Sequence, residues 1–201
     1  MRRKSMLLVA IVAALGVAAP GASAATVKLA GGSTTVALDK GVAGALAKAG
    51  VKVAVDKPAA AGAKGIAFPI SGGAIDPATG AGRVDHKGGL TFKAGRTKVG
   101  LSAFVVKVGK RSSLSAKLGK GRLTVFSLDT SKAKVTRPGI ATTIGGVRLK
   151  LTGKAAAALN GAFGVKLFAK GLVVGKATVK ATPAQVLLAG GSTALALDPG
   201  A

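Results

Sequence analysis

Short alternating segments separated by glycines are the feature that most constrains how this chain can fold. Apolar and polar residues alternate with a period of two in many short stretches, which is the pattern of β-strands with one buried face. Glycines follow most of these stretches, where they favour turns. Only two short segments have helical character. The sequence therefore predicts a mainly β protein, an antiparallel β-sandwich or barrel-like domain with two short α-helices.

The expected strands are spread along the whole chain. They cover residues 26–29, 34–38, 51–55, 66–70, 82–85, 90–93, 97–108, 113–118, 122–128, 133–136, 140–144, 147–151, 164–167, 172–180 and 185–189. Glycine pairs such as Gly72–Gly73 and Gly145–Gly146 are expected to punctuate them as turns. Residues 57–64, rich in Ala, Gly and Pro, are expected to form a linker or long loop.

The two expected helices have capping residues at their ends. Asp39 is a suitable N-cap for a helix over residues 40–49, and Gly50 is a suitable residue just past its end. Thr152 can cap a second helix over residues 154–162.

Each helix lies between two alternating segments, so the sequence contains an internal repeat. Residues 34–55 and 147–168 are two copies of a strand–helix–strand unit. A partial third copy occupies residues 186–201, where Leu188–Thr193 repeats the letters of Leu29–Thr34. This copy is either the start of a further module or a reused closing strand.

Residues 1–24 have the features of a secretory signal peptide. A basic start at Arg2–Lys4 precedes an apolar run over residues 6–19, and Ala22–Ala24 fits the small-residue cleavage rule. At ~1.5 Å per residue the apolar run reaches only ~21 Å, which is short of a ~30 Å hydrocarbon core. We therefore expect no transmembrane anchor. The expected mature protein is one domain over residues 25–185 that is secreted or associated with the cell envelope.

The composition excludes most familiar catalytic and metal centres. The chain has one His, no Cys and six acidic residues, all of them Asp, so paired catalytic carboxylates and clustered zinc ligands are not evident. No Gly-x-Ser-x-Gly elbow presents a nucleophilic serine. The sequence predicts a protein that is not an enzyme and has no metal centre.

The charge of +24, from 30 Lys and Arg residues, suggests an anionic partner. Most basic residues occupy the polar positions of strands, as in an ordinary solvated face. Lys110 and Arg111 lie in one expected hairpin turn, and Lys120 and Arg122 in the next. If these turns lie at one end of the fold, they would form a patch for anionic cell-wall polymer. Nucleic acid is not expected, because the protein is exported and has no Tyr or Trp for base stacking.

One stretch resembles a known family. Gly82–Leu90, with its His86-Lys-Gly-Gly-Leu sequence, follows the glycine-rich segment Gly65–Gly73 and precedes a long alternating strand. This arrangement resembles the HtaA (haem-transport-associated) domain of secreted and surface proteins in actinobacteria, as a divergent member. The resemblance implies a β-rich, non-catalytic module that binds haem and passes it toward haem-transfer proteins in iron acquisition.

The same resemblance implies site residues, and the match is incomplete. In haem-binding members a tyrosine ligates iron and a histidine supports it; His86 matches the histidine, and this chain has no tyrosine. His86 is then either an iron ligand itself or a turn residue hydrogen-bonded to backbone. Phe68 and Phe92 either line an apolar haem slot or pack in the core.

Overall fold

The computed structural model describes residues 26–184. Two helices, α1 (Lys40–Lys48) and α2 (Gly153–Phe163), interrupt a series of strands. The strands are β1 (Val27–Leu38), β2 (Lys52–Asp56), β3 (Ala60–Gly62), β4 (Gly65–Ile75), β5 (Gly82–His86), β6 (Gly89–Ala94), β7 (Thr97–Val108), β8 (Ser113–Leu118), β9 (Gly121–Asp129), β10 (Lys134–Thr136), β11 (Thr142–Leu151) and β12 (Val173–Pro183). The expected signal peptide, the strand at 185–189 and the partial repeat over 186–201 lie outside the described residues.

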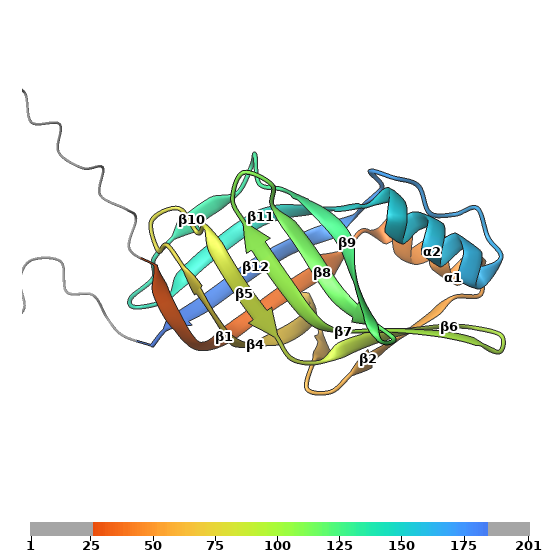
Figure 1. The fold of residues 1–201 in the computed structure, drawn as a ribbon, viewed down its shortest axis with the longest axis horizontal. Helices are drawn as coiled ribbons and strands as arrows, with labels where there is room; N and C mark the ends of the chain where they lie inside the picture. Colours follow the sequence, from red (N-terminus) through yellow and green to blue (C-terminus); the bar gives the residue numbers. More distant parts are fainter. Residues whose placement is uncertain (1–25, 185–201) are drawn as a thin grey trace, which may run out of the picture.

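Eight strands form a closed antiparallel ring in the order β7-β5-β4-β1-β12-β11-β9-β8, and the β7–β8 pairing closes it. Figure 1 shows this barrel-like body with both helices at one end. β6 pairs with the first half of β7 and β2 pairs with β6, so these two strands extend the sheet beyond the ring on the helical side. β3 pairs with β4, and β10 pairs with β11. The predicted fold class is confirmed.

Two glycine pairs that were expected to form turns, Gly72–Gly73 and Gly145–Gly146, lie inside long strands, and the pair Gly31–Gly32 does so too. Gly31–Gly32, Gly72–Gly73 and Gly145–Gly146 sit within β1, β4 and β11, and each coincides with a shift in strand register. Gly32 and Gly73 both have φ +117, and a Cβ on either would collide with a backbone carbonyl of the neighbouring strand. Glycine here permits a β-bulge, which bends a strand and helps a sheet to close.

The caps of both helices match the sequence prediction. The Asp39 carboxylate accepts hydrogen bonds from the backbone N–H groups of Gly41 (2.9 Å) and Val42 (3.4 Å), and Gly50 follows α1 with φ +68. The Thr152 hydroxyl accepts from the N–H of Ala155 at 3.2 Å and donates to the carbonyl of Thr124 at 2.7 Å. This second bond fixes the start of α2 to β9.

Two local predictions are wrong. Residues 164–167 do not form the strand that the second repeat predicted. They form a loop that is closed by the Asn160 side chain, which bonds both the N–H and the carbonyl of Phe168, at 2.9 and 2.7 Å. The second unit is therefore strand, helix and loop. Residues 57–64 are not wholly a loop, since they contain β3, which pairs with the start of β4.

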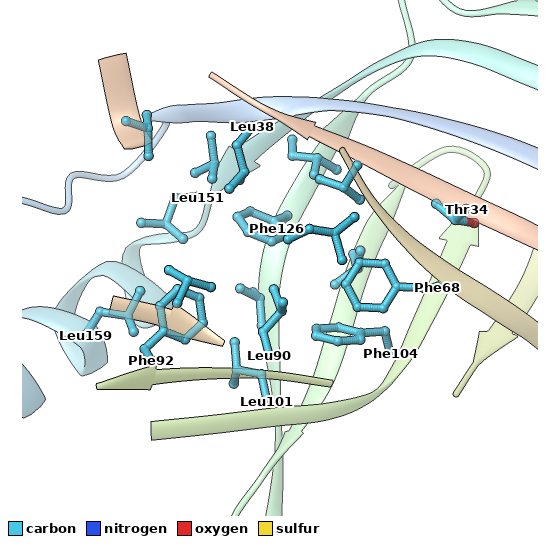
Figure 2. A pocket seen from close by; sticks show the side chains of 18 of the residues that line it. Thr34, Leu38, Phe68, Leu90, Phe92, Leu101, Phe104, Phe126, Leu151 and Leu159 are labelled. Carbon is cyan, nitrogen blue, oxygen red and sulfur yellow. The ribbon is translucent and has the colours of Figure 1, made fainter. Parts of the chain in front are cut away.

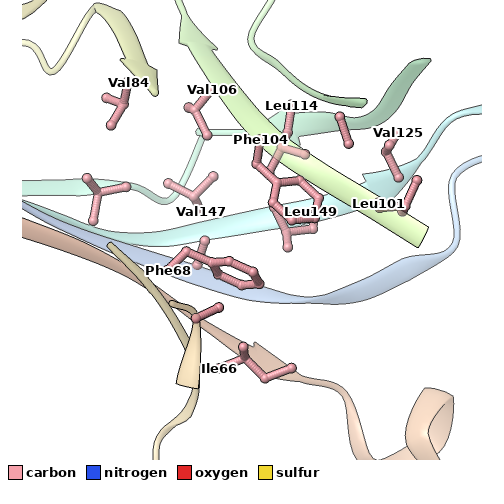
Figure 3. Packing of buried hydrophobic residues seen from close by; sticks show 14 of the residues in the cluster. Ile66, Phe68, Val84, Leu101, Phe104, Val106, Leu114, Val125, Val147 and Leu149 are labelled. Carbon is pink, nitrogen blue, oxygen red and sulfur yellow. The ribbon is translucent and has the colours of Figure 1, made fainter. Parts of the chain in front are cut away.

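The core fills the inside of the ring. Ile75, Val84, Val125 and Leu149 are its largest fully buried side chains. The rings of Phe68 and Phe104 meet edge to face with centroids 5.1 Å apart, a favourable aromatic geometry. Figure 3 shows these two rings among Val106, Leu149 and neighbouring aliphatic side chains. Within residues 26–184, no helix is long and apolar enough to cross a membrane.

Candidate functional site

An apolar pocket occupies the end of the barrel where the helices lie. Its walls come from the ring strands, from both helices and from the β2–β6 extension. In Figure 2, Thr34 lies at one end of this space and Phe92, Leu151 and Leu159 lie toward the other, with Leu90 and Phe126 between them. The remaining lining residues are Val36, Leu38, Val42, Leu46, Val53, Ile66, Phe68, His86, Leu101, Phe104, Val106, Leu114, Val125, Leu149, Phe168 and Val174.

The pocket is narrow in this conformation. The volume open to the centres of water-sized molecules is about 80 Å³, whereas an engineered apolar cavity that binds benzene measures about 150 Å³. A larger ligand therefore requires the walls to move apart. α1, α2, β2 and β6 are the walls that can do so without opening the ring, because none of them belongs to it.

Among the described residues that line the pocket, His86 and Thr34 are the only polar ones. His86 is the last residue of β5 and is 5 % exposed, and Thr34 of β1 is 3 % exposed. The Thr34 hydroxyl lies 2.6 Å from His86 Nε2, and His86 Nδ1 lies 3.3 Å from the Phe104 carbonyl oxygen. Both ring nitrogens are thus hydrogen-bonded to strands of the barrel wall.

The partners of the imidazole define which nitrogen is protonated in its neutral form. A carbonyl oxygen can only accept, so Nδ1 carries a proton, and in the neutral ring Nε2 then accepts a hydrogen bond from the Thr34 hydroxyl. Burial lowers the pKa of His86, and the Phe104 hydrogen bond and the charge of Asp85 offset part of that effect. His86 is therefore a neutral imidazole at physiological pH.

The sequence reasoning placed Phe68, His86 and Phe92 at one site, and all three line this one pocket. Of the two interpretations left open for His86, the geometry matches a side chain held by hydrogen bonds, with a hydroxyl as well as a backbone carbonyl. Sequence reasoning missed Thr34. Its signal is present in the alternation of β1, where Thr34 has the inward phase of Val36 and Leu38.

The residues do not fit axial ligation of haem iron. The apolar walls suit the faces of a porphyrin, but His86 is the only imidazole and the chain has no Tyr or Cys. The lone pair of Nε2 points at the Thr34 hydroxyl, which occupies the direction that an iron atom would need. Within residues 26–184, no group of three His, Cys, Asp or Glu side chains could hold a metal ion.

The four basic turn residues do not form one patch. The Lys110–Arg111 turn precedes β8 and the turn with Lys120 follows it, so the two turns lie at opposite ends of that strand. Arg122 has a structural contact: its guanidinium donates to the Ala103 carbonyl at 3.0 Å, beside a bulge where Ala103 has φ 47. The condition for a joint patch, that both turns lie at one end of the fold, is therefore not met.

The architecture defines a β-rich domain with a built-in apolar pocket, and two solved structures have the same fold. The C-terminal domain of HtaA from Corynebacterium glutamicum matches with a TM-score of 0.61 and 14% identity over 78% of this chain and 98% of that one. The domain-swapped dimer of its H434A variant matches with a TM-score of 0.52 and 14% identity, over 70% and 87%. The fold of this protein is HtaA-like.

Comparisons of sequence alone give no further relatives: no protein-family model matches the chain, and no curated protein matches it.

Proposed function

We propose that this protein is an exported, non-catalytic domain that binds an apolar small molecule in the pocket at its helical end, with haem as the first ligand to test. The observation behind the proposal is the lining of the pocket, which is apolar except for Thr34 and His86. Those two satisfy each other's hydrogen bonds. Such a surface binds ligands by removing apolar area from water.

The proposal that the protein is exported is based on the predicted signal peptide. The choice of haem as ligand is based on the HtaA-like fold together with the resemblance around His86. The side chains that could coordinate iron limit how haem would bind. Because His86 is held by Thr34 and Phe104, the porphyrin would bind through its apolar faces, and the iron would receive no protein ligand. Passing the ligand to a haem-transfer protein would then require no bond to iron to be broken.

The test is a pair of titrations, one with haemin followed by its absorbance and one with metal-free protoporphyrin followed by its absorbance and by the fluorescence of the porphyrin itself, because the protein has no Trp or Tyr. We expect both porphyrins to bind with similar affinity. Leu90→Trp fills the pocket and should abolish binding of both, whereas Ile140→Ala, an exposed position at the other end of the barrel, should leave it unchanged. Absence of binding by either porphyrin would refute haem as the ligand. Binding of haemin alone, lost in His86→Ala, would refute the mode without iron ligation.

A role in holding anionic wall polymer is the second function that the charge suggests. The turn residues that first pointed to it are separated in space, so that role needs a different site.

A further inference from the structure

Three lysines form a row on the outer face of the sheet extension. Lys52 of β2 is directly opposite Lys93 of β6, and Lys93 is directly opposite Lys98 of β7. Residues directly opposite on paired strands point to the same face. The next row, Val53, Phe92 and Val99, points to the other face, where Val53 and Phe92 line the pocket. The lysine row therefore faces outward, and all three lysines are exposed.

Such a row is unfavourable for folding, because like charges directly opposite on a sheet repel each other. Among the other like-charged cross-strand pairs in residues 26–184, Lys117 opposite Arg122 has no acidic partner, but the Arg122 guanidinium donates to the Ala103 carbonyl at 3.0 Å. Two further pairs are relieved by an acidic residue. Arg83, opposite Lys107, bonds to Asp85 at 2.8 Å. Arg148, opposite Lys176, bonds to Asp129 at 3.0 Å.

Lys52, Lys93 and Lys98 have no such relief among the described residues. None of them forms an ion pair within residues 26–184. The acidic residue on the same face of β2 is Asp56, four residues and ~13 Å along the strand from Lys52. Its carboxylate already accepts a hydrogen bond from the Thr91 hydroxyl at 2.8 Å. The row thus presents three positive charges across ~10 Å, at the ~4.8 Å strand spacing.

We propose that Lys52, Lys93 and Lys98 form a binding site for a linear polyanion whose phosphate or carboxylate groups repeat along a flexible chain. The row is straight and crosses the strands of the extension, which suits an extended ligand. The site lies on the opposite face of the β2–β6 extension from the pocket, so it is independent of the small-molecule function.

The surroundings favour such a polymer over a membrane or a nucleic acid. The adjacent row on the outer face consists of Ala54, Thr91 and Gly100. No large apolar side chain there could insert into a bilayer, as interfacial membrane binders require. No aromatic ring there could stack on a base, as single-stranded nucleic-acid binders require.

The test compares two triple variants that remove the same charge. The site variant is Lys52→Gln, Lys93→Gln and Lys98→Gln. The control variant is Lys28→Gln, Lys134→Gln and Lys180→Gln. These three lysines are exposed on strands and lie opposite uncharged residues. The opposite residues are Ala74 for Lys28, Gly145 for Lys134, and Ser33 and Thr143 for Lys180. Binding of inorganic polyphosphate to each purified protein is measured at several salt concentrations, and melting temperatures are measured without polymer.

We expect the site variant to bind polyphosphate about 100-fold more weakly, at roughly fivefold for each lysine, with a shallower salt dependence. The control should bind within about threefold of the parent protein. The site variant should also melt at a higher temperature than the control, because its repulsion has been removed. Equal losses of binding in both variants, or no gain in melting temperature, would overturn the proposal. Binding to vesicles of anionic lipid without binding to polyphosphate would also overturn it, in favour of a membrane surface.

Discussion

At the scale of single residues, the hydrogen bond between Thr34 and His86 determines what the pocket can do. A buried imidazole nitrogen without a partner is costly, and the Thr34 hydroxyl satisfies it at 2.6 Å. The same contact makes the nitrogen unavailable as a ligand. A neutral, fully bonded histidine leaves the pocket without a free polar group on its walls, which favours an apolar ligand.

Removing that hydroxyl should destabilise the protein. Thr34→Val keeps the shape of the side chain but leaves His86 Nε2 buried and unpaired, so we expect a loss of about 1–3 kcal/mol in the free energy of unfolding. Thr34→Ser keeps the hydroxyl and should lose less. Urea unfolding of the three proteins measures the difference. Equal stability of Thr34→Val and the parent would mean that the 2.6 Å contact contributes nothing to folding.

His86 should also make stability depend on pH. Its pKa is lowered in the folded state, relative to about 6.5 in the unfolded chain. The unfolded state therefore binds the proton more readily than the folded state. The contribution of neutral His86 to the free energy of unfolding is complete above about pH 6.5, and it is lost as the pH falls from there through the pKa of the folded state. It is the only histidine. We expect a lower unfolding free energy at about pH 5 than at about pH 7.5, with a smaller change in His86→Gln.

At the scale of elements, the sequence predicted the positions of the strands more accurately than their lengths. The glycine pairs show why. Alternation identified most strands, and Asp39 and Thr152 identified both helices, because these signals are local. A glycine pair that forms a turn and one that forms a bulge look alike locally. The difference lies in the neighbouring strand, as at Gly73, whose Cβ would meet the Arg83 carbonyl. The Thr34–His86 contact joins residues 52 apart, so it too was not visible in the sequence.

Two glycine substitutions should therefore have opposite effects. Gly73→Ala puts a Cβ against the backbone of β5 at a positive φ, so we expect destabilisation by at least about 1–3 kcal/mol. Gly44→Ala lies within α1 with no heavy atom near the new Cβ, so we expect stabilisation by about 0.5–1 kcal/mol. Thermal and urea unfolding distinguish the two. A stable Gly73→Ala protein would show that the bulge is dispensable for closing the ring.

At the scale of the whole molecule, the charge of +24 opposes the compact state. Only three ion pairs join described residues, and two of them share Asp129. The Ser131 hydroxyl and Lys150 lower the pKa of this carboxyl. Because so much of the basic charge has no acidic partner, screening by salt should stabilise the fold more than it weakens these pairs.

We expect the melting temperature to rise as sodium chloride increases from about 0.02 M to about 0.5 M, over which the screening length falls several-fold. Scanning calorimetry of the protein at matched pH measures the shift. The Lys52, Lys93 and Lys98 triple glutamine variant should show a smaller rise, because part of the repulsion is already absent. A melting temperature that falls with salt would mean that ion pairs outweigh repulsion.

The pairing of the first and last described strands gives the molecule two distinct poles. Leu29 lies opposite Pro183, and the Ala184 N–H donates to the Lys28 carbonyl at 2.8 Å, so the chain enters and leaves the barrel side by side, away from the helices (Figure 1). Any attachment made through residues beyond Val27 or Pro183 would hold the protein by that pole. The helices, the pocket and the tip of the β6–β7 hairpin would then face outward, free to meet whatever diffuses past.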